Sequence, residues 1–259
     1  MAGRLPWALA PCALVLMIAP MAAQQISNLE PERPLAMEDA QPVSFRAFSG
    51  GFDWTFNLRR DYSNDHGPGF SLDYGLARGL EVGAALRYVT RPERNAQRGI
   101  SSGDLFVHAL YALKTETASF PALAVRADVQ FPTGLDSRGT DLHLALLGTR
   151  SFDDFRLHAN LLFTRLGDPS PGERAERWAG VAGVDFPVSR RGLTDTLLLA
   201  DVVGRTHPLI DGPAIFGAEM GVRHRIGSQT VLFGAAGSEF SGGHNRRVLT
   251  LRVGVSQMY

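Results

Sequence analysis

Apolar and polar residues alternate along twelve stretches of this chain, from Phe52 to the last residue. In the first stretch, Phe52–Leu58, the even-numbered positions are apolar and the odd-numbered positions are polar. Such alternation predicts a β-strand with one apolar face and one polar face. The other stretches span approximately 70–76, 80–90, 104–114, 122–131, 141–151, 155–166, 178–187, 195–206, 214–226, 230–240 and 247–258. Most have about the 9–11 residues that a tilted strand needs to cross the hydrocarbon of a bilayer.

The connections between these stretches alternate between short and long. Short ones lie at 77–79, 115–121, 152–154, 188–194 and 227–229, and mostly longer ones at 63–69, 91–103, 132–140, 167–177, 207–213 and 241–246. An even number of strands joined in this way is typical of transmembrane antiparallel up-and-down β-barrels. We therefore expect an all-β fold, a closed barrel of about 12 strands. The alternative is a soluble β-sandwich or lipocalin-like barrel, which would bury the charged strand faces in a dry core at high cost.

Three short turns predict how their strands pair. Asp153-Asp154 and Gly227-Ser228 each set a register that brings apolar residues together across the hairpin. Ala77-Arg78-Gly79 suits a three-residue hairpin with Gly79 in the left-handed conformation. The expected pairs are Phe152 with Phe155, Leu146 with Leu161 and Leu144 with Phe163 in one hairpin, and Val222 with Phe233 and Met220 with Ala235 in the other.

The first 23 residues have the pattern of a secretory signal peptide. Arg4 supplies the positive charge, Trp7–Pro20 forms the apolar region, and Ala22-Ala23 is a small-residue cleavage site. A membrane anchor is the alternative, but the apolar run is short and polar residues follow it.

The rest of the chain divides into a lead-in and a barrel. Residues 24–51 contain scattered prolines and charges, and predict an irregular periplasmic lead-in with an extended piece near 43–48. Residues 52–259 form the predicted barrel. The only cysteine, Cys12, lies within the signal peptide, so the mature chain has no thiol for a disulfide or for thiol chemistry.

Composition excludes some classes of function and supports one location. The formal net charge is zero, which gives no electrostatic basis for binding nucleic acid. A mean hydropathy of −0.05 excludes a bundle of transmembrane helices. The last stretch places Leu251, Val253, Val255 and Tyr259 on one face, a pattern read by the barrel-assembly machinery of the outer membrane. The predicted location is therefore the outer membrane of a Gram-negative bacterium, in contact with its lipid.

The polar faces of the strands predict what lines the lumen. The charges of both signs form either a lattice that stiffens the barrel or a pore lining that sets ion selectivity, and the sequence leaves both open. The predicted pore-lining residues are Asp73, Glu81, Arg87, Asp104, His108, Arg126, Asp128, Arg156, His158, Asn160, Asp185, Asp201, Glu219, Arg223 and Arg252. The same faces also hold Asp53, Asn57, Gln130, His143 and Arg205.

Catalytic and metal chemistry find no support in the sequence. His143 is expected opposite Thr164, which places it roughly 20 Å along the strand from His158 and out of hydrogen-bond reach. No paired histidines at ligand spacing and no phosphate-binding loop are present. We therefore expect no enzyme, no catalytic residues, no metal and no cofactor. The segment Pro132–Asp136 is read as turn chemistry, with a ligand-gating loop as its alternative.

Several segments, in order and spread over nearly the whole mature chain, resemble one known family. They are Glu38–Val43, Tyr74–Leu76, Leu80–Gly83, Pro121–Arg126, Phe131–Gly134, Thr149–Phe152 and Arg156–Asn160. These pieces are similar to the outer-membrane transporter family named for the meta-pathway of phenol degradation. Gln41, where similar chains tend to have an aromatic residue, departs from the pattern. The resemblance implies a barrel that admits hydrophobic small molecules and carries no catalytic set.

The expected function is a porin-like channel for the passive passage of small solutes, aromatic or hydrophobic ones included. A structural barrel with a plugged lumen is the alternative, and a lipid-modifying outer-membrane enzyme is the third. The sequence identifies neither the solute nor the oligomeric state.

Overall fold

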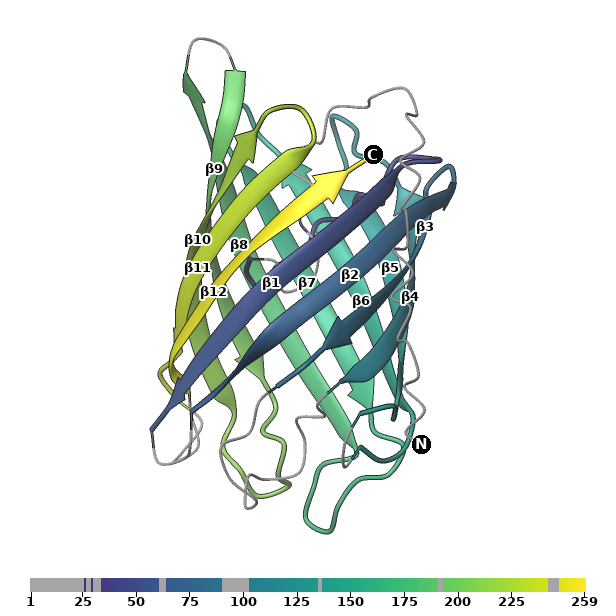
Figure 1. Ribbon diagram of the computed structural model, residues 1–259, viewed down its shortest axis with the longest axis vertical. Coiled ribbons are helices and arrows are strands. Elements are labelled where there is room, and N and C mark those ends of the chain that lie inside the picture. Colours follow the sequence, from purple (N-terminus) through teal and green to yellow (C-terminus); the bar gives the residue numbers. More distant parts are fainter. Residues whose placement is uncertain are drawn as a thin grey trace, which may run out of the picture.

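The protein is a closed barrel of twelve antiparallel strands (Figure 1). The structure is a computed structural model, and it describes residues 26, 29, 34–60, 64–89, 103–134, 137–190, 193–241 and 247–259. Each strand pairs with the next along the chain, and β1 pairs with β12 to close the sheet. The strands are β1 Phe48–Arg59, β2 Asp65–Ala77, β3 Leu80–Arg87, β4 Asp104–Lys114, β5 Ala122–Phe131, β6 Asp141–Ser151, β7 Arg156–Arg165, β8 Glu176–Arg190, β9 Leu193–Arg205, β10 Ile215–Ile226, β11 Thr230–Glu239 and β12 Arg247–Met258.

The two faces of the sheet differ as the alternation predicts. Outward side chains are apolar and exposed, including Leu72 at 57%, Leu161 at 50% and Val253 at 55%. Inward positions hold buried charges such as Asp185 and Arg223. An apolar outside and a polar inside, with no unpaired edge, is the architecture of transmembrane barrels. The predicted fold class and strand number are confirmed. Among the described residues, no helix has the length and apolar character needed to cross a membrane.

Most strand boundaries agree with the prediction to within two residues. The second strand begins at Asp65, five residues earlier than expected, the eighth continues to Arg190, and β3 ends at Arg87 instead of residue 90. The first begins at Phe48, because Ser49 and Gly50 already pair with both β2 and β12. Backbone pairing thus continues beyond the stretch in which side chains alternate.

One predicted register is confirmed and the other is wrong by one residue. In β6 and β7, Leu146 lies opposite Leu161 and Leu144 opposite Phe163. In β10 and β11 the observed partners are Val222 with Gly234, Met220 with Ala236, and Arg223 with Phe233. The turn there has three residues, 227–229, with Gly227 at a φ of 72°. Because side chains alternate with a period of two, this shift turns Phe233 into the lumen, where it is buried.

The two ends of the barrel carry different connections. The short-turn end, at the top of Figure 1, holds the C-terminus and the tight turns, among them the one at Gly79, whose φ of 76° confirms the predicted left-handed position. The long-loop end carries the longer connections. There the loops 166–175 and 206–214 are joined, because Arg174 N–H donates to the Pro208 carbonyl and Ile210 N–H donates to the Gly172 carbonyl.

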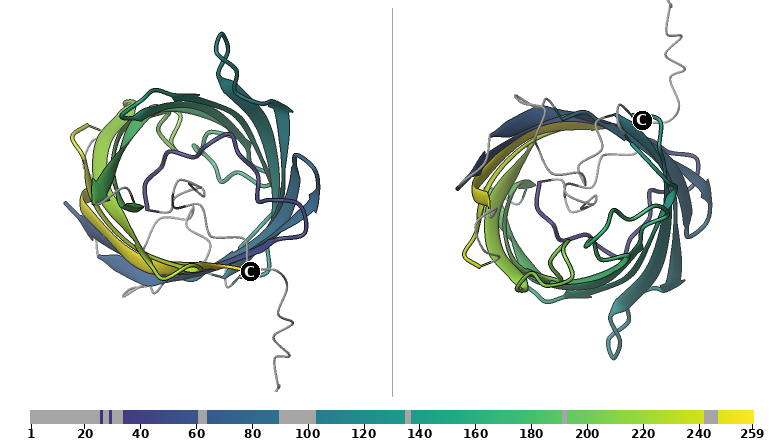
Figure 2. Two further views of the ribbon diagram at one scale, coloured as in Figure 1. Left: turned by 90° about the horizontal axis from the view of Figure 1, so that it is seen from above. Right: turned by 90° about the horizontal axis from the view of Figure 1, so that it is seen from below.

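The segment before the first strand lies inside the barrel. Residues 34–43, which we call the plug segment, run through the lumen, and Figure 2 shows this path from both ends. The chain reaches them from β1 through a left-handed turn at Arg46, with a φ of 67°, and a bridge between Phe45 and Gly75. Gly75 permits this approach, since an added Cβ would lie 2.0 Å from the Ser44 carbonyl oxygen.

This position differs from the expected periplasmic lead-in. The described part of 24–47 is irregular as predicted, whereas residues 48–51 belong to β1. The backbone of the plug segment finds its hydrogen-bond partners on the barrel wall instead of in water. The signal-peptide boundary falls outside the described residues, and the division into signal, lead-in and barrel stays a prediction.

Candidate functional site

The inner wall carries the charged side chains that the sequence placed there. Each one is buried or half-buried, whereas exposed apolar residues occupy most of the alternate positions. The buried ones are Asp53, Asp73, Glu81, Asp104, His108, Asp128, His158, Asn160, Asp185, Asp201, Arg223 and Arg252. The half-buried ones are Asn57, Arg87, Arg126, Gln130, His143, Arg156, Arg205 and Glu219. That they line a conducting pore remains a prediction.

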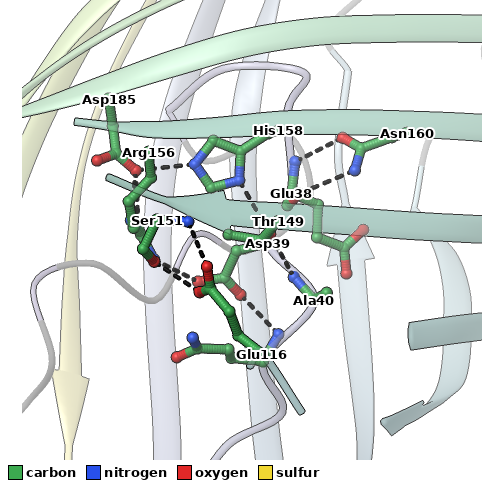
Figure 3. A network of polar contacts seen from close by, with 11 residues as sticks. Glu38, Asp39, Ala40, Glu116, Thr149, Ser151, Arg156, His158, Asn160 and Asp185 are labelled. Atoms are coloured by element: carbon green, nitrogen blue, oxygen red, sulfur yellow. Dashed lines mark hydrogen bonds and ion pairs between the residues drawn. The ribbon is translucent and has the colours of Figure 1, made fainter. Parts of the chain in front are cut away.

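Glu38 is the most fully bound residue of the plug segment. Its N–H donates to Asn160 Oδ1 at 2.9 Å, and its carbonyl accepts from Asn160 Nδ2 at 2.9 Å (Figure 3). Its carboxylate pairs with Arg126 Nη1 at 2.7 Å, while Arg126 Nε donates to Asp128 at 2.9 Å. One side chain of β7 and one of β5 therefore hold both the backbone and the charge of this residue.

Other wall side chains bind the backbone of the plug segment in the same way. An irregular segment has no neighbouring strand to satisfy its buried N–H and C=O groups, so side chains must do so. Four wall side chains accept hydrogen bonds from its N–H groups: Glu219 from Ala36 at 3.0 Å, Asp201 from Met37 at 2.9 Å, Thr149 from Ala40 at 3.0 Å and Glu81 from Val43 at 2.6 Å. In the opposite direction, Arg252 donates to the Pro34 carbonyl at 2.8 Å. Several polar lumen residues thus act as docking groups.

A chain of polar contacts near the short-turn end ties Asp39 to the wall (Figure 3). Arg156 contacts Asp39 at 3.5 Å and Asp185 at 2.6 Å. His158 lies between Asp185, 2.8 Å from Nε2, and Thr149, 3.2 Å from Nδ1. The order hydroxyl, imidazole, carboxylate is that of a hydrolase triad. However, Thr149 is fully buried and its hydroxyl oxygen already accepts Ala40 N–H, so no substrate carbonyl can reach it.

Apolar contacts complete the docking. Leu29, Leu35 and Met37 are at most 2% exposed and pack with inward residues of the short-turn half. Their partners are Val181 of β8, Leu197 and Leu199 of β9, and Val231 of β11. Gly183 leaves room for Met37, because an added Cβ would lie 2.3 Å from the Met37 Sδ.

A cavity of about 480 Å³ lies between the plug segment and the long-loop end. Leu29, Ala36, Glu38 and Gln41 contribute to it from the plug side. Its wall has both apolar and charged parts. Apolar residues such as Leu162, Val203 and Ile215 come from β7, β9 and β10. The cationic residues are Arg87, Arg126, Arg177, Arg205, Arg247 and Arg252. Such mixed lining suits a small solute with an apolar body and a polar group.

Several arginines of the wall are engaged with acidic partners or with the plug segment. Arg205 and Arg247 both pair with Glu239, and Arg126 joins Glu38 to Asp128. Within the plug segment, burial raises the pKa of Glu38 from its ordinary value of 4.5 to about 7, although Arg126 opposes this effect. Burial also raises the pKa of Asp39 against the opposing effect of Arg156. The docked segment therefore favours the protonated form of both carboxyls.

Two further observations concern sites that the sequence left open. Thr133 Oγ1 accepts Leu105 N–H and Gly134 N–H donates to Asp104, so the described part of Pro132–Asp136 is bonded to the start of β4. Leu135 and Asp136 fall outside the described residues, and the choice between a turn and a ligand-gating loop stays a prediction. Asp73, Glu81 and His108 bring three potential metal ligands within 4.8 Å of one another. This group was not predicted from the sequence, because its members lie on three strands with no common spacing.

Comparisons with known proteins agree with the fold. No protein-family model matches the chain, and neither does any curated protein sequence. Among solved structures, the COG4313 outer membrane channel from Pseudomonas putida F1 has a TM-score of 0.63 at 13% identity, covering 85% of this chain and 98% of that one. The KdgM porin and the NanC porin each have a TM-score of 0.56 at 12% identity, covering 80% of this chain and 98% of theirs. At these identities the similarity shows the outer-membrane barrel fold alone.

Proposed function

We propose that this protein is an outer-membrane channel for the passive passage of small solutes, aromatic or hydrophobic ones included, and that its plug segment controls passage. One observation carries the proposal. The 480 Å³ cavity ends on a segment held by side-chain hydrogen bonds and apolar contacts, and not by strand pairing. A segment attached in this way can leave without breaking the sheet, whereas a wall strand cannot.

The outer membrane is the proposed location. The exposed apolar side chains on every strand, such as Phe70 at 51% and Val202 at 55%, suit contact with lipid. The short-turn end then faces the periplasm and the long-loop end faces outward. Leu251 and Val253 point outward on β12, which ends beside Tyr259, and this supports recognition by the barrel-assembly machinery. Membership in the phenol meta-pathway transporter family is part of the same proposal.

A structural barrel with a permanently plugged lumen is the second candidate, and the docked plug segment itself favours it. The lipid-modifying enzyme, third in order, loses support because Thr149 and His158 lie under the plug and face away from lipid. The observation that separates the first two candidates is whether the plug segment leaves the lumen spontaneously in the full mature chain.

Current through single barrels in planar bilayers tests the proposal. The full mature chain should give brief current steps, and a variant lacking residues 24–42 should give larger and longer ones. A heat-dependent shift on a gel verifies that each barrel is folded. If both folded proteins conduct nothing, the channel proposal is wrong. If only the shortened one conducts, the structural barrel is favoured. Uptake of a panel of aromatic, aliphatic and sugar solutes into vesicles then defines the solute class.

A further inference from the structure

Three side chains from three neighbouring strands converge on one point of the lumen wall. Asp73 on β2, Gly83 on β3 and His108 on β4 are directly opposite one another in the register. Glu81 precedes Gly83 by two positions and so shares its inward face. His108 Nε2 lies 3.2 Å from Asp73 Oδ1 and 3.3 Å from Glu81 Oε1. All three side chains are buried, with Asp73 at 4% and Glu81 and His108 at 8% exposure.

Gly83 makes this convergence possible. The side chains of Asp73 and His108 meet over the place that a side chain at residue 83 would fill. An added Cβ would lie 2.3 Å from Asp73 Oδ1 and 2.5 Å from His108 Cε1, closer than real Cβ atoms come to such neighbours. The carboxylate of Asp73 and the imidazole of His108 therefore occupy the space over Gly83, and the absence of a side chain there lets them approach each other.

Two of the three distances between the candidate ligand atoms are those of a coordination sphere, and all three atoms lie within 4.8 Å of one another. One imidazole N–H favours an acceptor near 2.9 Å, but here a single nitrogen faces two carboxylate oxygens at nearly equal and longer distances. Ligand atoms held by a tetrahedral cation at about 2.0–2.1 Å are separated by about 3.3 Å. One imidazole nitrogen and two carboxylate oxygens are a ligand set for Zn²⁺ and similar divalent transition cations.

From this geometry we propose that Asp73, Glu81 and His108 form a binding site for a divalent transition cation. Two carboxylates neutralise the charge of the cation, and the neutral imidazole supplies the third ligand. All three residues border the cavity, which gives an entry path and leaves the fourth position for water. Val43 N–H donates to the other carboxylate oxygen of Glu81 at 2.6 Å and orients this ligand. A bound cation would therefore also stabilise the docked plug segment through Glu81. The site does not depend on transport by the barrel.

Calorimetric titration of the folded, chelator-treated mature barrel with Zn²⁺ tests the site. We expect one Zn²⁺ per chain, and a loss of affinity of about 100-fold or more in His108→Ala and in Glu81→Gln, the latter nearly unchanged in shape. His143→Ala is the matched control, because His143 is another inward histidine, bonded to Thr164 and Gln130, and should leave affinity unchanged. Gly83→Ala should weaken binding, because the added Cβ would displace the side chains of Asp73 and His108. With Co²⁺, the wild type and His143→Ala should both give the visible absorption of a tetrahedral site, and His108→Ala should not.

Three results would overturn the proposal. They are the absence of stoichiometric binding, equal affinity in His108→Ala, and equal loss in His143→Ala. The first would assign the group to a protonated His108 paired with two carboxylates, and the second to an adventitious ion only. If His108→Ala fails to give the heat-dependent gel shift, the Glu81→Gln and Gly83→Ala titrations decide the question.

Discussion

Asn160→Leu should release the plug segment from the lumen. The substitution keeps the approximate shape of the side chain and removes both hydrogen bonds to the backbone of Glu38, which are 2.9 Å long. The Glu38 N–H and carbonyl then remain buried without these partners in the docked state, but are hydrated when the segment leaves. An unsatisfied buried group costs about 1–3 kcal/mol, so docking should weaken by about 2–6 kcal/mol. Even the lower figure raises the undocked fraction about 30-fold.

A cysteine reporter measures that fraction directly. Because the only cysteine, Cys12, lies in the predicted signal peptide, Met37→Cys gives the mature chain a single thiol at a position that is 1% exposed when docked. A maleimide reagent then reacts at a rate proportional to the undocked population, provided that docking is fast. We expect Asn160→Leu to be labelled about 30 times faster or more, and to show a larger fraction of open time in planar bilayers.

Thr164→Val is the matched control for this experiment. Thr164 lies on the same strand and the same face as Asn160, and its hydroxyl contacts His143 at 3.0 Å. It should therefore lose a lumen hydrogen bond without any effect on labelling at position 37. Equal labelling rates in Asn160→Leu and Thr164→Val would refute the conclusion that Asn160 holds the segment.

Three more predictions follow from the packing and the charges. Gly183→Leu should displace Met37 and lengthen open times in bilayer recordings, whereas Gly180→Leu, with no atom within 4 Å of the added Cβ, should not. Because the docked pKa of Glu38, about 7, exceeds its ordinary 4.5, docking is strongest at low pH and loses about 3 kcal/mol as pH rises through this window. The labelling rate, divided by that of an exposed thiol at the same pH, should therefore increase from about pH 5 to about pH 8, and Glu38→Gln should reduce this increase. Leu72→Arg on the lipid face should lower the free energy of unfolding in liposomes by about 2–4 kcal/mol. An unchanged denaturation midpoint would show that Leu72 of β2 does not face the lipid.

The sequence predicts the strands and their faces because both depend on local alternation. Asp185 and Phe186 are neighbours in the chain, and their chemistry alone assigns one to the lumen and the other to the outside, where Phe186 is 45% exposed. Register is less local, since it depends on the number of residues in each turn. The Asp153-Asp154 turn was interpreted correctly, but one additional turn residue after Gly227 reverses the face of Phe233.

The plug segment and the cation site were missed for a related reason. Glu38 and Asn160 are 122 residues apart, and nothing in an irregular, proline-rich segment indicates which wall residues its backbone will meet. Asp73, Glu81 and His108 were each predicted to face inward, but their convergence requires two registers together with the absence of a side chain at Gly83. A glycine at an inward position between two polar neighbours is the one sequence signal that could have found the cation site.

The balance of docking terms favours a segment that can move. Ordering the backbone of residues 34–43 costs about 10–20 kcal/mol. Seven backbone groups bonded by the wall contribute about 4–11 kcal/mol, and burial of Leu35 and Met37 contributes about 3–6 kcal/mol. Gain and cost are of the same size, so the net docking free energy is small and a change of a few kcal/mol can reverse it. The lumen charges that stabilise the docked plug segment therefore also set how often the segment undocks and the channel opens. A stabilising charge lattice and a conducting channel are then compatible, because they correspond to the docked and undocked states of the same segment.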